Sequence, residues 1–210
     1  MSDLMIQYVV PEYGVNYDKG YIGFTYPKDH IFAKGTAWFT RWDRMGDILA
    51  THALLVTGEN ECIEAVGSGV RQADLQTYFD DPNCQIFFRK PRDLSPAIAD
   101  QMEALARPEI GKPYDNALIV GAAAAGSFLG HLINNITGGI AEDLLDKLLN
   151  HDDKWICSEL VAYCMDSIPE YRDQGILARP DETINPQELF EDDTIFSAWK
   201  KEPAEAYAGD

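Results

Sequence analysis

Residues 51–66 have the sequence THALLVTGENECIEAV, from which the architecture of the chain can be predicted. This stretch holds two short apolar runs, ALLVT at residues 53–57 and CIEAV at residues 62–66, with GENE between them. Short apolar runs on either side of a turn that contains Gly and Asn are typical of a β-hairpin. We therefore predict two antiparallel strands here, joined by a turn at residues 58–61.

Further elements follow from local patterns on both sides of the hairpin. The run QIFFR predicts a strand at residues 85–89, and another short strand is expected at residues 5–10. Ser95 and Pro96 begin a helix, because serine caps a helix N-terminus and proline suits the first helical position. Apolar residues at helical spacing predict the clearest helix of the chain at residues 157–168.

One long internal segment and the last part of the chain complete the expected organisation. We interpret residues 117–154 as a helical insertion and the tail from about residue 200 as disordered. Asn185-Pro186-Gln187-Glu188 is a capping-box pattern that predicts a helix start, and residues 194–199 are expected to form a final strand. Strands and helices do not alternate as βαβ units, so the sequence predicts a single α+β domain over all 210 residues.

The charge of the chain restricts its partners. Acidic residues outnumber basic ones by 35 to 17, which gives a formal net charge of -18. Nucleic-acid binding relies on basic stripes that release counterions from phosphates, so we expect no nucleic-acid partner. Anionic membranes and anionic wall polymers should be repelled for the same reason. A well-solvated surface explains the charge most simply, and a cationic substrate or partner is the alternative.

The N-terminus and the apolar segments bear on location. Met1-Ser2-Asp3-Leu4 lacks the basic and apolar regions of a secretory signal, so we expect synthesis and folding in a cytoplasm. The apolar run at residues 117–126 is too short to span a bilayer, which predicts no stable membrane insertion. Release by lysis or by a dedicated secretion route would carry the protein elsewhere.

The four cysteines are expected to be reduced. They show neither a CxxC pair nor a zinc-ligand spacing, and no metal or organic cofactor is predicted. Cys157 and Cys164 lie two helical turns apart, about 10 Å, which exceeds the roughly 7 Å that a disulfide allows between Cα atoms. Cys62 and Cys164 are assigned to the core, and Cys84 lies in a turn without a visible activating group.

Cys157 is the candidate nucleophile because it begins the predicted helix. The positive end of the helix dipole lowers the pKa of a thiol placed there, and the thiolate is the reactive form. The backbone N–H groups of the first turn have no partner within the helix, so they can stabilise a developing oxyanion. The alternative is an inert core cysteine, because Cys157 lies on the apolar face of its helix. Periodicity alone favours that alternative.

His52 is the candidate base and Glu64 the candidate group that orients it. His52 stands at the start of a predicted strand, and a strand holds a side chain more rigidly than a loop does. A hairpin loop of three or five residues would place His52 and Glu64 on one face, whereas two or four would separate them. The alternatives are a structural histidine and a solvated carboxylate.

Several motifs in a fixed order carry a resemblance to a known family. They are Thr51-His52, Ile63-Glu64-Ala65, Gly111-Lys112-Pro113-Tyr114-Asp115 and Cys157-Ser158-Glu159-Leu160-Val161, followed by Asn185-Pro186. The chain resembles the NlpC-type cysteine hydrolases and, more narrowly, their circularly permuted YiiX-like branch. In that branch the histidine strand precedes the cysteine helix, the reverse of papain. The resemblance covers roughly residues 46–190.

The resemblance implies a papain-like core, in which an antiparallel sheet packs against the helix that bears the cysteine. It implies Cys157 as nucleophile, His52 as base, Glu64 as orienting group and Tyr114 as a residue close to the site. The expected activity is that of a cysteine hydrolase, peptidase-like or amidase-like, on an amide bond such as one in a peptidoglycan-type peptide. The alternatives are a lipid acyl hydrolase or acyltransferase of the same fold, a catalytically inactive ligand-binding module, and an interaction protein with an acidic surface.

The chain departs from the family pattern in three places. Leu54 stands where the family has glycine, which would narrow the groove beside His52. Gly46-Asp47 lies too close to His52 to fill the place of the family's early Gly-Asp motif. Residues 117–154 form a long segment, either a lid or substrate wall, or additional core packing.

Overall fold

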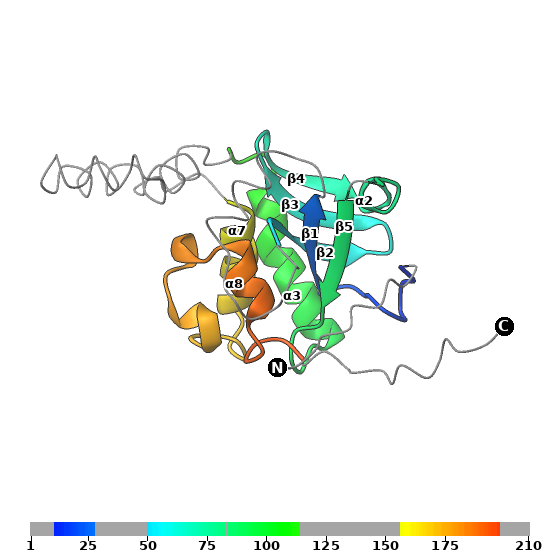
Figure 1. Cartoon of the computed structure of the whole chain (residues 1–210). Helices are drawn as coiled ribbons and strands as arrows, with labels where there is room; N and C mark the ends of the chain where they lie inside the picture. Colours follow the sequence, from blue (N-terminus) through cyan, green and yellow to red (C-terminus); the bar gives the residue numbers. More distant parts are fainter. Residues whose placement is uncertain (1–10, 28–49, 83, 114–155, 198–210) are drawn as a thin grey trace, which may run out of the picture.

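The computed structural model describes residues 11–27, 50–82, 84–113 and 156–197 (Figure 1). Five strands in this part form one antiparallel sheet of order β4-β3-β2-β1-β5. The strands are β1 (Ile22–Pro27), β2 (His52–Gly58), β3 (Glu61–Val66), β4 (Gly69–Asp74) and β5 (Cys84–Arg89). The helices are α2 (Gln76–Phe79), α3 (Pro96–Ala106), α7 (Cys157–Asp166) and α8 (Pro186–Glu191), with short 3-10 turns η1 (Arg107–Glu109), η2 (Gly175–Ala178) and η3 (Asp181–Thr183). The predicted α+β class with an antiparallel sheet is confirmed.

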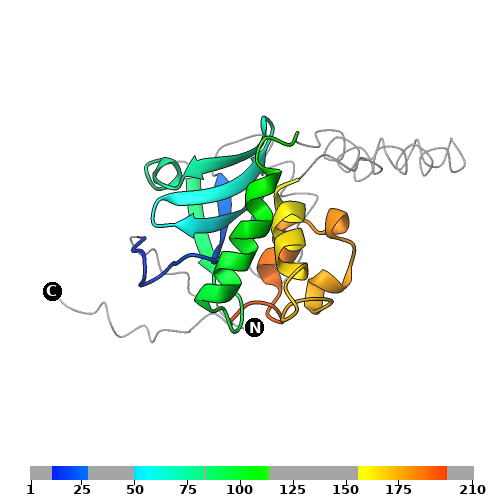
Figure 2. The ribbon, with the colours of Figure 1, turned by 180° about the vertical axis from the view of Figure 1, so that it is seen from behind.

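The sheet is covered on both faces. Helices α3, α7 and α8 lie on one face, with α3 and α7 side by side, and the short α2 lies on the other (Figures 1 and 2). Leu55 and Ile63 belong to the core on the helical face, whereas Leu54 and Val56 belong to a second cluster on the α2 face. Because both faces of β2 are buried, its sequence is a continuous apolar run and does not alternate.

The β2–β3 hairpin contains a bulge. Gly58 pairs with Glu61, but Val56 pairs with Cys62, so Thr57 is an extra residue on the β2 side. The bulge therefore shifts the pairing of β2 against β3 by one residue along all of the hairpin beyond it.

This shift decides on which face two candidate site residues lie. A two-residue turn alone would place His52 and Glu64 on opposite faces, as the rule for hairpin loops predicts. With the bulge at Thr57, Leu54 pairs with Glu64 instead. His52, two residues before Leu54, then shares a face with Glu64.

Two of the predicted helix starts are confirmed in detail. The Ser95 side chain accepts a hydrogen bond from the Ile98 backbone N–H at 3.3 Å, and Pro96 is the first residue of α3. At α8, Asn185 Oδ1 accepts from the Glu188 N–H at 2.9 Å, and the Asn185 N–H donates to Glu188 Oε2 at 3.4 Å. The reciprocal pair is a complete capping box.

One predicted strand is wrong, and other predictions fall outside the described residues. Asp192 Oδ1 accepts from the N–H groups of Thr194 at 2.6 Å and Ile195 at 3.3 Å, which turns the chain where a strand was expected at residues 194–199. Among residues 194–197, which the structure describes, only an isolated bridge between Phe196 and Pro91 is found. The strand at residues 5–10, the helical insertion at 117–154, the tail from about 200 and Gly46-Asp47 all lie outside the described residues. None of the described helices has the length and apolar character that a bilayer crossing requires.

The packing of α8 against the sheet leads to a first prediction. Phe190 is fully buried, and its ring meets that of Phe24 edge to face with centroids 5.1 Å apart. Phe190→Ala should lower the free energy of unfolding by about 3–5 kcal/mol, because it removes a large buried ring. Val15→Ala is the control, since Val15 is 69% exposed. Urea unfolding followed by circular dichroism measures both, and equal losses would contradict the packing described.

Candidate active site

The candidate residues meet at one end of the sheet. His52 is the first residue of β2 and lies opposite Thr25 near the end of β1. Cys157 is the first residue of α7, which packs against β2 and β3. Strand β2 and helix α7 therefore bring together two residues that are 105 positions apart in the sequence.

Cys157 is buried and partnered. Its side chain, in a residue only 6% exposed, interacts with the His52 ring and with the backbone amides of Ala53 and Ser158. Burial alone would raise the pKa of Cys157, but the positive charge of His52 and these hydrogen bonds outweigh it and hold the pKa below its usual value. These contacts thus favour the thiolate, against the effect of burial.

His52 lies between Cys157 and Glu64. His52 Nε2 is 2.7 Å from Glu64 Oε2, which leaves Nδ1 as the ring nitrogen for Cys157. Burial lowers the pKa of His52, but the Cys157 thiolate and the Glu64 carboxylate together raise it to about 10. Glu64 and Cys157 therefore favour the protonated imidazolium form of His52, and His52 in turn favours the thiolate form of Cys157.

Glu64 is a buried anion and not a solvated carboxylate. The residue is 0% exposed. Its Oε2 accepts from His52 and from the Tyr78 hydroxyl. Its Oε1 accepts from Arg71 Nε at 2.9 Å and forms an ion pair with Arg71 Nη2 at 2.8 Å. Burial raises the pKa of Glu64, but the bonds from His52, Tyr78 and Arg71 lower it to about 2. The carboxylate is therefore ionised throughout the physiological range.

Arg71 and Tyr78 are members of the site that the sequence analysis missed. Val66 and Gly69 pair across the next turn, so that Arg71 on β4 lies directly opposite Glu64. The Gly67-Ser68 dipeptide between two strands is a two-residue hairpin signal that would have given this register. Helix α2 then brings the Tyr78 ring nearly parallel to that of His52, with centroids 6.4 Å apart.

The backbone around both candidate residues is held by buried hydrogen bonds. The Ala50 N–H donates to Oε1 of the buried Gln187 at 2.6 Å, which fixes the chain two residues before His52. The Ser158 hydroxyl donates to the Ile184 carbonyl at 2.6 Å, which fixes the start of α7. The capped segment at α8 thus supports the site without touching its reactive groups.

Tyr114 lies outside the described residues, but the chain that leads to it is fixed. The Gly111 N–H donates to the Val70 carbonyl, and the Val70 N–H donates to the Lys112 carbonyl, both at 2.9 Å. Gly69, at φ +114°, is required here, because a Cβ atom would lie 2.6 Å from the Lys112 oxygen. This close approach joins β4 to residues 111–112.

The other cysteines have different surroundings. All four are free of disulfides, as predicted. Cys62 and Cys164 are buried, and burial raises the pKa of each thiol. Cys84 is partly buried. In the described ranges, His, Cys, Asp and Glu side chains form no group that could hold a metal ion.

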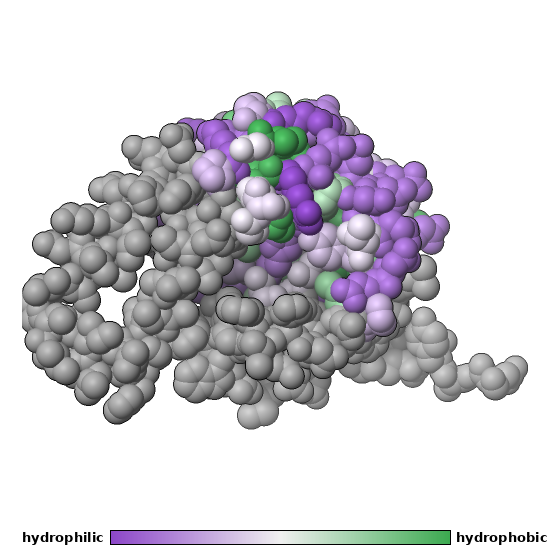
Figure 3. All heavy atoms as spheres, turned by 90° about the horizontal axis from the view of Figure 1, so that it is seen from above, coloured by the Kyte–Doolittle hydropathy of each residue, from purple (hydrophilic) through white to green (hydrophobic). Residues whose placement is uncertain are grey.

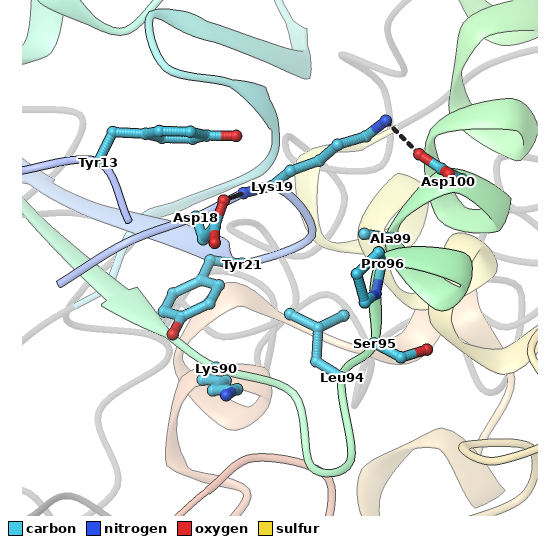
Figure 4. Close-up of a pocket in the computed structure, with 10 residues that line it drawn as sticks. All are labelled: Tyr13, Asp18, Lys19, Tyr21, Lys90, Leu94, Ser95, Pro96, Ala99 and Asp100. Carbon is cyan, nitrogen blue, oxygen red and sulfur yellow. Dashed lines mark hydrogen bonds and ion pairs between the residues drawn. The ribbon is translucent and has the colours of Figure 1, made fainter. Parts of the chain in front are cut away.

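A separate cavity of about 310 Å³ lies at the other end of the sheet (Figure 4). It is lined by the segment that leads into β1, by Lys90 and by the first turn of α3. Lys19 in this cavity is paired with Asp100 and Glu103, each at 2.5 Å. The cavity has no residue in common with the cluster of Cys157, His52 and Glu64.

The surface at the candidate site's end of the sheet is mainly polar. Figure 3 looks down on the end of the molecule at which β1 finishes, and the described side chains there are mostly hydrophilic around a small hydrophobic area. This agrees with the acidic, polar composition of the chain.

Comparisons with known proteins identify no relative of the chain. Neither a family model, nor a curated protein, nor a solved structure matches the chain. A functional proposal therefore depends on the residues and the geometry given above.

The arrangement is suited to covalent chemistry. A thiolate at a helix start, a histidine in contact with it and a carboxylate behind the histidine are the components of an activated nucleophile. The Ser158 amide of the first turn of α7 and the Ala53 amide of β2 stand beside the sulfur. They can also stabilise negative charge that develops on a bound carbonyl oxygen.

Glu64 gives the folded state a pH-dependent stability. Its pKa is lower in the folded chain, about 2 against 4.5, so its stabilisation is present above pH 4.5 and is lost as pH falls towards 2. As the pH falls from 4.5 to about 2, the free energy of unfolding of wild type should therefore decrease by up to about 3 kcal/mol more than that of Glu64→Gln. Urea unfolding at a series of pH values measures the difference, and Glu61→Gln reports the effect of removing an exposed carboxylate from the same strand. If the difference in unfolding free energy between wild type and Glu64→Gln does not change with pH, Glu64 is not an anion stabilised by the fold.

Proposed function

We propose that the protein is a cysteine hydrolase in which Cys157 is the nucleophile, His52 the base and Glu64 the group that orients His52. The observation that carries the proposal is the contact between His52 and Cys157 at the start of α7, with Glu64 bonded to the far ring nitrogen. An inert core cysteine would have a raised pKa, as Cys164 on the same helix does. The lowered pKa of Cys157 favours the reactive alternative.

The proposed reaction is acyl transfer to water. The Cys157 thiolate attacks the carbonyl carbon of an amide or ester, and a C–S bond forms while the carbonyl electrons move to oxygen. Amides at the start of α7 stabilise the oxyanion. His52 gives its proton to the leaving nitrogen or oxygen as that bond breaks, which leaves a thioester on Cys157. His52 then takes a proton from water, the hydroxide attacks the thioester, and the thiolate departs.

We further propose that the core is papain-like and permuted, with the histidine strand before the cysteine helix. An antiparallel sheet that packs against α7 and the order of His52 and Cys157 in the chain support this interpretation. The resemblance to NlpC-type hydrolases of the YiiX-like branch then favours an amide bond, such as one in a peptidoglycan-type peptide, as the bond cleaved. An acyl hydrolase or acyltransferase for lipids would use the same residues and is the second candidate. A ligand-binding module without activity is disfavoured, because it would not need an ionised pair at the site.

The reactivity of Cys157 tests the proposed pair. Cys157 should react with iodoacetamide in the native protein at about pH 6.5, and His52→Ala should slow it about 100-fold, since an ordinary thiol is only about 1% thiolate there. Cys164 is the matched control, because it lies on the same helix, is 1% exposed and has a raised pKa. Mass spectrometry of peptides gives the rate at each cysteine. Protection of Cys157 until the protein unfolds would reject the nucleophile.

Formation of a thioester tests the first half of the reaction. Brief exposure to 4-nitrophenyl acetate should leave an acetyl group on Cys157 in wild type, with a burst of nitrophenolate. The His52→Ala variant should lose the burst, because its thiol is not activated. Cys164→Ala should keep the burst, since Cys164 is part of the core. Acetylation spread over several cysteines in the native protein would contradict the assignment.

A further inference from the structure

Glu64 is the meeting point of more donors than an orienting carboxylate requires. One oxygen accepts from His52 and Tyr78, and the other accepts from Arg71 Nε and forms an ion pair with Arg71 Nη2. The donors come from three elements: β2, β4 and α2. A carboxylate whose only task was to orient an imidazole would need the His52 bond alone.

The charges along this chain of contacts alternate. Arg71 is positive, Glu64 negative, His52 positive and Cys157 negative, and each contacts the next. With Cys157 as the thiolate of the proposed function, the four groups together have no net charge, although Glu64 is fully buried. Without Arg71 the buried group would have one uncompensated negative charge, which is costly in a low-dielectric interior.

We propose that Arg71 and Tyr78 are positioning residues that keep the buried Glu64 carboxylate ionised and fixed while His52 exchanges its proton. The inference rests on the proposed function, in which His52 becomes neutral after it has protonated the leaving group. At that stage Glu64 has lost its cationic neighbour on β2 but still has Arg71 on β4. Glu64 therefore does not take up a proton itself, and it continues to hold Nε2 of His52.

Arg71 is placed to act by charge and Tyr78 by geometry. Arg71 lies on the edge strand β4, and its side chain is 54% exposed, so it reaches Glu64 from the solvent side. The Tyr78 hydroxyl donates to the same oxygen that His52 contacts, and the Tyr78 ring lies against the His52 ring. The titratable and charged groups that meet at Glu64 in the described structure are His52 of β2, Arg71 of β4, Tyr78 of α2 and Cys62 of β3, with Cys157 of α7 beyond His52.

The test is the pH profile of Cys157 alkylation, measured from about pH 4 to about pH 12 in the folded full-length chain, so that it includes the loss of the His52 proton and its upward shift. The lower limb reports formation of the thiolate, and the upper limb reports loss of the His52 proton. Arg71→Met removes a positive charge, so every group nearby holds its proton more tightly, and both limbs should move up by about 1 pH unit. Arg71→Lys keeps the charge and should restore most of the wild-type profile.

Two further variants separate this inference from other outcomes. Arg179→Met is the matched control. Arg179 is 44% exposed, and its ion pair, at 3.0 Å, is with Glu188 and not with Glu64. The pH profile of this variant should have the same two limbs as that of wild type. Tyr78→Phe keeps the ring and removes the donor, so its limbs should move in the same direction as those of Arg71→Met, but less. If Arg71→Met does not fold, Tyr78→Phe still tests the proposal.

Each result has a definite meaning. If wild type shows two limbs and neither Arg71→Met nor Tyr78→Phe moves them, Arg71 and Tyr78 are only structural and the proposed function stands. If wild-type Cys157 shows no limb below that of an ordinary thiol, the proposed function itself fails and the inference fails with it. An Arg71→Lys profile equal to that of Arg71→Met would also reject the role given to charge.

Discussion

The structure depends on one buried carboxylate. Glu64 lies on β3, between β4 and β2, and a buried carboxylate without partners there would strongly destabilise the fold. The fold compensates it from three sides, with His52 on one neighbouring strand, Arg71 on the other and Tyr78 on the helix that follows. The order of the strands, the register of two hairpins and the place of α2 all serve that compensation.

The sequence predicted the parts of the fold that local patterns specify. The β2–β3 hairpin, the Ser95 cap and the Asn185 capping box are short-range features, and each was found. Strands β1 and β4 were missed. In IGFTYP the apolar residues Ile22, Phe24 and Tyr26 alternate, but the run is short and contains Gly and Pro, whereas GVRQAD has few apolar residues. Their place is set by pairing with β2 and β3, which is long-range information.

The candidate site shows the same division between local and long-range information. Helical periodicity predicts the same position for Cys157 and Cys164, on the apolar face of one helix. In the structure their thiols have opposite pKa directions, because only Cys157 meets His52 and amides from β2. Arg71 and Tyr78 could not be found without the register of the second hairpin and the position of α2. The state of the Cys157 thiol thus depends on the strand across from it, which provides His52 and the Ala53 amide, together with the Ser158 amide of its own helix.

The bulge at Thr57 has a consequence for how such a chain can diverge. Two residues of added or lost length between His52 and Glu64 preserve which side of the sheet each occupies, whereas a single residue reverses one of them. A descendant with an odd change in this hairpin would need a compensating bulge or a new acidic position on the neighbouring strand. The parity of the loop therefore decides whether His52 and Glu64 can lie on one face, whatever the identity of the turn residues.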